Sequence, residues 1–170
     1  MSSPHRQERL KGFLEGDSST NAYHINNALI AIGSGGLFGV GIGNNVQTAG
    51  YLPESITDSM FAVIGETIGF VGIIVVLFFY YMLLSRILKV ADCTRESYYQ
   101  LIAIGIFAWL TGHVVVNIAA MTGLVPLTGI TLPLLSKGGT SLILNMAIIG
   151  LALNISQYTM RSDLTDAERK

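Results

Sequence analysis

The sequence predicts an all-α, polytopic membrane protein with three transmembrane helices that follow a Gly-rich, membrane-proximal segment. Two observations support this fold class. Hydrophobic residues make up 51% of the 170 residues and charged residues only 12%, whereas charged residues make up about 25% of a soluble domain. The charged residues are also missing from long runs rather than thinned evenly, which is the pattern that a bilayer imposes on a sequence.

Residues 1–58 form the first predicted region, which is polar at its start and rich in glycine later. Residues 22–32 can form a short helix, but its apolar part is too short to span a bilayer. Six glycines then break this helix, at positions 33, 35, 36, 39, 41 and 43. We therefore expect an extracellular segment with a Gly-rich interfacial or re-entrant helix.

Residues 59–157 form the predicted membrane region, with spans over 60–84, 99–121 and 141–155 and an outer loop over 122–140. Each span is close to the roughly 20 residues that cross about 30 Å of hydrocarbon. His113 and Asn117 lie four residues apart in the second span and so share a helix face. We expect these two side chains, and Asn145 in the third span, to form interhelical hydrogen bonds.

The distribution of Lys and Arg predicts the orientation. Six of these residues lie in the loop 85–98 and the tail 158–170, and four lie on the other side of the three spans. Because positive charge is enriched in cytoplasmic loops, the N-terminus is expected outside and the tail 158–170 in the cytoplasm. The net charge of −1 gives no field that would attract nucleic acid.

The glycines predict close packing rather than a nucleotide site, because no Lys-Ser/Thr pair follows them as in a phosphate-binding loop. Three of them lie four residues apart: Gly35, Gly39 and Gly43. This spacing indicates close helix packing or a tight, water-lined turn. Three glycines of the first span predict a second face of small residues: Gly65, Gly69 and Gly72.

Three carboxylates, Glu54, Asp58 and Glu66, lie around the predicted outer end of the first span. Ser55 and Asp58 match a capping box, so Asp58 has a structural interpretation as well as a functional one. Glu66 lies about two turns into an apolar run, where an ionisable group is costly and therefore a functional candidate. Asp58 and Glu66 are separated by about 12 Å along a helix, more than the roughly 6.5–9.5 Å of an inverting hydrolytic pair.

The loop 129–141 contains one proline and two adjacent glycines. It is either a structured hairpin or irregular backbone that lines a polar cavity. In the second case three side chains are available to anionic ligand groups: Ser136, Lys137 and Thr140.

Several motifs resemble those of the SEDS family of shape, elongation, division and sporulation proteins. Around the first span these are Tyr51-Leu-Pro-Glu54, Thr57-Asp58 and Ile64-Gly-Glu66. Near the end of the chain they are Asn117-Ile-Ala-Ala-Met-Thr-Gly-Leu-Val-Pro126, Gly129-Ile-Thr-Leu-Pro-Leu-Leu-Ser136 and Gly138-Gly139. The resemblance covers residues 5–157, and the threonine before Leu132-Pro133 resembles the division member more than the elongation member.

This resemblance implies a membrane glycosyltransferase that polymerises the peptidoglycan precursor lipid II in the bacterial cytoplasmic membrane. Asp58 matches the family's essential extracellular aspartate, with the implied role of general base toward the acceptor sugar hydroxyl. The motifs supply further candidates for substrate binding: Glu54, Thr57, Glu66, Ser136, Lys137, Gly138 and Gly139. No cofactor is assigned, and a requirement for a divalent cation stays open.

The implied partners are a class B penicillin-binding protein, other divisome proteins and membrane lipid, with no nucleic acid. Two other functions remain open. A lipid II flippase would need polar groups along a path across the bilayer, and deep ionisable groups are nearly limited to Glu66 and His113. The other alternative is a non-catalytic scaffold for a penicillin-binding protein.

The chain departs from the family in length and at two motif positions. It resembles only the last three spans and the large extracellular loop before them, so we expect a fragment, one part of a split gene or a truncated sequence, inactive by itself. Lys137 stands where the family usually has tyrosine, and Ser59 where it usually has phenylalanine.

Overall fold

A computed structural model describes residues 20–41, 59–94, 96–126, 129–136 and 138–168, and within these ranges the regular secondary structure is helical. Four helices are formed: α2 (Thr20–Ser34), α4 (Met60–Cys93), α5 (Ser97–Met121) and α6 (Gly139–Glu168). The last three contain stretches long and apolar enough to cross a membrane. The predicted fold class, an all-α membrane protein with three spans and a shorter helix before them, is confirmed.

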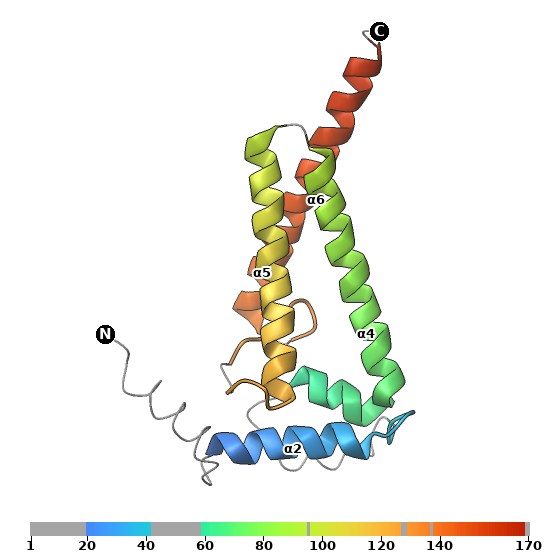
Figure 1. Ribbon diagram of the computed structural model, residues 1–170, viewed down its shortest axis with the longest axis vertical. Helices are drawn as coiled ribbons and strands as arrows, with labels where there is room; N and C mark the ends of the chain where they lie inside the picture. The colour runs from blue at the N-terminus through green and yellow to red at the C-terminus, as the bar shows by residue number, and fades with distance from the viewer. Residues whose placement is uncertain (1–19, 42–58, 95, 127–128, 137, 169–170) are drawn as a thin grey trace, which may run out of the picture.

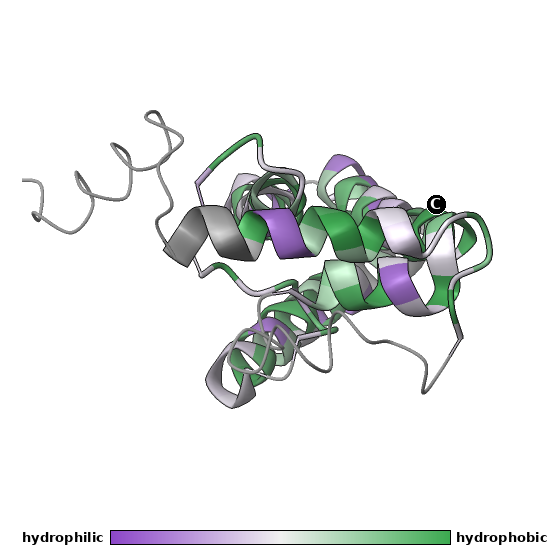
Figure 2. Cartoon of the chain, turned by 90° about the horizontal axis from the view of Figure 1, so that it is seen from below, coloured by the Kyte–Doolittle hydropathy of each residue, from purple (hydrophilic) through white to green (hydrophobic). Residues whose placement is uncertain are grey.

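The three long helices run alongside one another, and α2 lies across one end of this bundle (Figure 1). We call this end the α2 end, and the opposite end, where α4 turns into α5, the turn end. Figure 2 shows the α2 end from below, with α2 crossing over the ends of the other helices. The described length of α2 is too short to span a bilayer, as expected from the sequence.

Helix α4 is broken at Gly69, whose φ of 77° and ψ of −164° are not helical. Its first part, residues 60–68, lies near α2, and only residues 70–93 run along the bundle (Figure 1). These 24 residues span about 36 Å, enough to cross about 30 Å of hydrocarbon. The helix begins at Met60, as predicted for the first span, but it continues past the predicted end at residue 84, so Arg86 and Lys89 lie on the helix rather than in a loop.

The other predicted bounds are closer to the structure. The helix predicted over 22–32 extends over Thr20–Ser34, and the span predicted over 99–121 begins at Ser97. Helix α6 begins two residues before the predicted 141 and continues to Glu168. Most of the predicted tail 158–170 is therefore helical in its backbone, because α6 continues after its apolar stretch ends.

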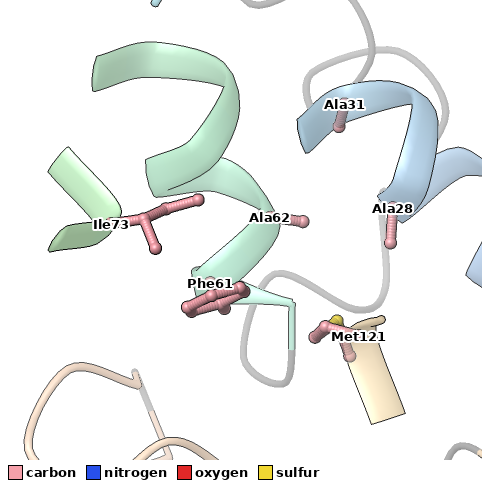
Figure 3. Close-up of a cluster of buried hydrophobic side chains, with 6 residues drawn as sticks. All are labelled: Ala28, Ala31, Phe61, Ala62, Ile73 and Met121. Carbon is pink, nitrogen blue, oxygen red and sulfur yellow. The ribbon is translucent and has the colours of Figure 1, made fainter. Parts of the chain in front are cut away.

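Three clusters of buried hydrophobic side chains hold the helices together. The cluster at the α2 end consists of Ala28, Ala31, Phe61, Ala62, Ile73 and Met121 (Figure 3). The middle cluster consists of Tyr80, Val114 and Leu132. The cluster at the turn end consists of Ile87, Ile106, Leu110 and Ala152. Because the alanines of α2 are small, this helix packs close to the start of α4 and the end of α5.

Many large hydrophobic side chains on the long helices point outward, among them Phe78, Trp109 and Ile143. In water such surfaces would be unfavourable, but lipid tails are as apolar as these side chains. The exposed apolar faces are therefore consistent with the membrane location that the sequence predicts.

Candidate functional site at the α2 end

The predicted site residues divide into two groups. Four of them lie outside the described residues: Glu54, Thr57, Asp58 and Lys137. Four others are described: Glu66, Ser136, Gly138 and Gly139. The structure therefore shows how the four described residues are positioned. For the other four it shows only the described residues that adjoin them in the chain.

The break in α4 is stabilised by the glycine-rich segment that follows α2. In a continuous helix the amides of Phe70 and Val71 would donate to the carbonyls of Glu66 and Thr67. Here those carbonyls instead accept hydrogen bonds from the amides of Val40 at 2.9 Å and Gly41 at 3.1 Å. The amide of Phe70 donates to the Gly36 carbonyl at 2.9 Å, and that of Val71 to the Leu37 carbonyl at 3.2 Å.

These four hydrogen bonds satisfy the amides of Phe70 and Val71 and the carbonyls of Glu66 and Thr67. We call this arrangement the glycine lock: residues 35–41 bonded to residues 66–71 across the Gly69 break. Unpaired backbone groups at this depth would each cost free energy comparable to a lost hydrogen bond. The lock therefore explains how a helix break is tolerated at the edge of an apolar span.

Glycine is required on both sides of the lock. An added Cβ on Gly35 would overlap the carbonyl oxygen of Gly65, and one on Gly39 would overlap that of Thr67. The close packing predicted for these two glycines is confirmed, whereas Gly43 lies outside the described residues. Gly69 does not belong to a smooth helix face as predicted, because it is the residue at which the helix breaks.

Glu66 lies on the first part of α4, before the break, and its side chain is 2% exposed. Its predicted position, about two turns into the apolar run that begins at Met60, is confirmed, although the helix breaks three residues later at Gly69. An ionisable group at such a position must face protein or water, and Glu66 faces protein. Since the Glu66 carbonyl belongs to the glycine lock, the backbone that carries this carboxylate is fixed.

Helix α4 starts at Met60, with Ser59 as its N-cap, and no side-chain hydrogen bond caps it. The two residues of the predicted capping box, Ser55 and Asp58, lie outside the described residues. Ser59 is buried, and Phe61 packs in the cluster shown in Figure 3. The residue that directly precedes this buried start in the chain is Asp58.

The loop between α5 and α6 is tied to the bundle by two side chains. The Nδ2 group of Asn117 donates to the Ile130 carbonyl at 2.7 Å, and the Tyr80 hydroxyl donates to the Pro133 carbonyl. Leu132 is buried between these two attachments. The described part of the loop is thus a structured connection packed between helices, which was one of the two interpretations of its sequence.

The loop leads from this packed region to the paired glycines at the start of α6. Ser136 is buried, and its amide donates to the Leu132 carbonyl at 3.1 Å. An added Cβ on Gly138 would lie 2.5 Å from the Ser141 hydroxyl oxygen, so little space is left there. Gly139 is the first residue of α6 and has open space around it. Thr140 is exposed.

The polar residues of the second span differ in what they bond to. The Nδ1 atom of His113 lies 2.9 Å from the Trp109 carbonyl of the same helix, and the centroids of the two rings are 4.5 Å apart, with the ring planes tilted by 41°. The prediction of an interhelical bond for His113 was therefore wrong, because its Nδ1 atom bonds to the backbone carbonyl four residues earlier in the same helix. The Nδ2 group of Asn117 donates to the Ile130 carbonyl in the loop. Asn145 is buried, and its interhelical bond stays a prediction.

Two residues that the sequence did not single out contribute to this region. Tyr80 was one aromatic residue among many in an apolar run, and only its hydroxyl distinguished it from the neighbouring phenylalanines. Asn27 in α2 is also buried, and its Nδ2 group has no hydrogen-bond partner among the residues that the structure describes. In the part of the chain that the structure describes, no three His, Cys, Asp or Glu side chains are grouped so that they could hold a metal ion.

Comparison with known proteins decides the family. The FtsW/RodA/SpoVE family of cell cycle proteins matches residues 1–161. The chain belongs to this family. It is 40% identical over 161 residues to stage V sporulation protein E of Bacillus subtilis, and 41% identical over 162 residues to the probable peptidoglycan glycosyltransferase FtsW of Coxiella burnetii. These alignments cover 94% and 92% of the chain but 44% of each relative, so the chain spans less than half of their length.

A solved structure has the same fold, and it is described in the words "Structural coordination of polymerization and crosslinking by a peptidoglycan synthase complex". The match has a TM-score of 0.70 and 29% sequence identity, and it covers 92% of this chain and 43% of that chain. The family expectation drawn from the motifs is confirmed, and the chain corresponds in length to a part of its relatives.

Proposed function

We propose that this chain is the part of a lipid II-polymerising peptidoglycan glycosyltransferase that carries its general base, Asp58. Family membership and the names of the relatives support the reaction class. The observation that carries the proposal for this chain is the glycine lock, which fixes the first part of α4 directly after Asp58. Catalysis of this kind requires a base held at a defined distance from the acceptor, and a rigid support provides it.

In the proposed reaction the Asp58 carboxylate accepts the proton of the acceptor sugar hydroxyl. The hydroxyl oxygen bonds to the anomeric carbon of the growing glycan, while the bond from that carbon to the pyrophosphate breaks and undecaprenyl pyrophosphate leaves. Asp58 is two residues before the first residue of α4, and the positive end of a helix dipole favours the ionised carboxylate. Because aspartate is a weak base, the proton moves together with the attack.

The remaining candidates are proposed to bind the lipid-linked sugars and the pyrophosphate: Glu54, Thr57, Glu66, Ser136, Lys137, Gly138 and Gly139. Two features support this assignment. Glu66 is carried by backbone that the glycine lock fixes. The loop that leads to Ser136 is attached to α5 through Asn117 and to α4 through Tyr80, so it cannot move freely with respect to the bundle.

The proposed location is the bacterial cytoplasmic membrane, with the N-terminus outside and the tail in the cytoplasm. The proposed partners are a class B penicillin-binding protein and other divisome proteins. The solved relative is part of a peptidoglycan synthase complex, which supports a partner of this kind. The exposed apolar faces of α4 and α5 are suited to contact a transmembrane helix of such a partner.

The test replaces Asp58 by Asn in the complete protein, with Asp92→Asn as the matched control. Asp92 is exposed at the turn end, so its replacement has the same chemistry without a neighbouring catalytic group. We expect glycan polymerisation from lipid II to fall by about 10²–10⁴ in the Asp58 variant, the usual effect of losing a general base. The control should polymerise like the wild type at equal membrane abundance.

An Asp58→Asn variant that polymerises at the wild-type rate would refute the proposed role. The same membranes also distinguish a flippase from a glycosyltransferase, because the transport of labelled lipid II across the bilayer and its polymerisation can both be measured. Transport without polymerisation by the wild-type protein would refute the glycosyltransferase assignment.

A further inference from the structure

A groove lies between α4 and α6 near the turn end, far along the bundle from the glycine lock. Its volume is about 510 Å³, within the roughly 300–1,000 Å³ typical of ligand sites. Apolar side chains form its inner walls, Leu83 and Ile87 from α4 and Ile149 and Leu153 from α6. Because it lies at the other end of the molecule, the groove is separate from the proposed active site.

The lining of the groove also includes polar and positively charged side chains. Arg86 and Lys89 line it from α4, and Ser156 and Thr159 line it from α6. The two cations are three residues apart, so they lie on the same side of the helix. Both are exposed, and neither forms an ion pair with a side chain that the structure describes, which on α6 means those up to Met160.

The positions of the two cations along α4 correspond to a membrane surface. The crossing part of α4 begins at Phe70, and Lys89 follows 19 residues later. At 1.5 Å per residue this is about 28 Å, close to the roughly 30 Å thickness of the hydrocarbon layer. Arg86 lies one turn further in, and its long side chain can extend to the same level. Both charges therefore reach the level of the lipid headgroups.

We propose that this groove binds a phospholipid with an anionic headgroup, with an acyl chain along the apolar walls and the phosphate between Arg86 and Lys89. The apolar walls match the acyl chain of such a lipid, and the two cations match its phosphate. Basic pockets between membrane helices bind anionic headgroups, and a guanidinium can donate two parallel hydrogen bonds to one phosphate. An apolar protein helix in the same place would leave both cations beside a surface without acceptors.

The chain contains its own reporter for this site. Cys93 is the only cysteine, its side chain is exposed, and it lines the groove. The test measures how fast a maleimide labels Cys93 in the purified chain in detergent. Added phosphatidylglycerol is expected to slow the labelling severalfold and in a concentration-dependent way, whereas phosphatidylcholine at the same concentration should have little effect.

Two sets of variants make the test specific. Replacing both cations, as Arg86→Gln with Lys89→Gln, should abolish the protection by phosphatidylglycerol. Leu153→Trp should also reduce it by filling the groove, whereas Leu151→Trp, at an exposed position outside the groove, should leave it unchanged. Circular dichroism of each variant establishes that the helices are retained, and native mass spectrometry counts the bound lipid independently of the thiol.

The proposal is overturned if the two lipids protect Cys93 equally, if neither protects it, or if protection survives in the double variant. Stronger protection by undecaprenyl phosphate than by phosphatidylglycerol would assign the groove to the polyprenyl carrier instead. None of these outcomes depends on polymerisation, so failure here is distinguishable from failure of the proposed function.

Discussion

Replacing Gly69 by Ala tests the glycine lock directly. The φ and ψ of Gly69 lie in a region that only glycine occupies readily, and placing another residue there costs about 1–3 kcal/mol. The added Cβ would also overlap the Gly39 amide nitrogen and lie 2.7 Å from the Leu37 carbonyl oxygen. Both are backbone atoms held by the lock, and forced overpacking costs about 1–3 kcal/mol more.

The two contributions together give a loss of about 2–6 kcal/mol in the free energy of unfolding. For a chain of this size each kcal/mol lowers the melting temperature by about 2–4 °C. Thermal unfolding of the purified chain in detergent, followed by circular dichroism, should therefore show a decrease of about 4–24 °C.

Gly105→Ala is the matched control. Gly105 lies inside α5, and an added Cβ there would meet nothing within 4 Å. Because alanine is favoured over glycine in a helix by about 0.5–1 kcal/mol, this variant should melt at the wild-type temperature or slightly above it. A Gly69→Ala variant that melts like the wild type, or an equal decrease in both variants, would refute the reasoning.

Two further predictions concern the loop attachment and the orientation. Tyr80→Phe removes the hydrogen bond to the buried Pro133 carbonyl and should destabilise the chain by about 1–3 kcal/mol, whereas Tyr81→Phe, at an exposed neighbouring position, should have no measurable effect in the same melting experiment. Equal melting temperatures would contradict a role for the Tyr80 hydroxyl. Cys93 is expected to resist a membrane-impermeant thiol reagent until cells are opened, because the turn end is predicted to be cytoplasmic. Ready labelling in intact cells would reverse the orientation.

The sequence alone determined the number and type of the main helices. A bilayer core offers no water to backbone polar groups. A run of about 20 apolar residues therefore forms a helix there, because a helix pairs these groups with one another. The ends of α5 followed from the apolar run to within two residues. The motifs around Asp58 and in the loop after α5 also identified the family. Each motif consists of neighbouring residues, so it can be recognised in the sequence without the structure.

The candidate site was predictable only as a set of residue types. The sequence indicated that Glu66 must face protein or water, and the residue is buried in protein. It did not indicate which part of α4 carries it, nor that the Tyr80 hydroxyl and Asn117 hold the loop. Those contacts join residues that are 53 and 13 positions apart, and local patterns contain no information on such pairs.

The start of the membrane-crossing part of α4 was decided by tertiary structure. No proline marks a boundary near Gly69, and a single glycine inside an apolar run is compatible with a continuous helix. The helix breaks there because the amides and carbonyls of residues 36–41, about thirty positions earlier in the chain, replace the helical partners of residues 66–71. The apolar run thus determined that a helix forms, whereas distant backbone groups determined where it begins to cross.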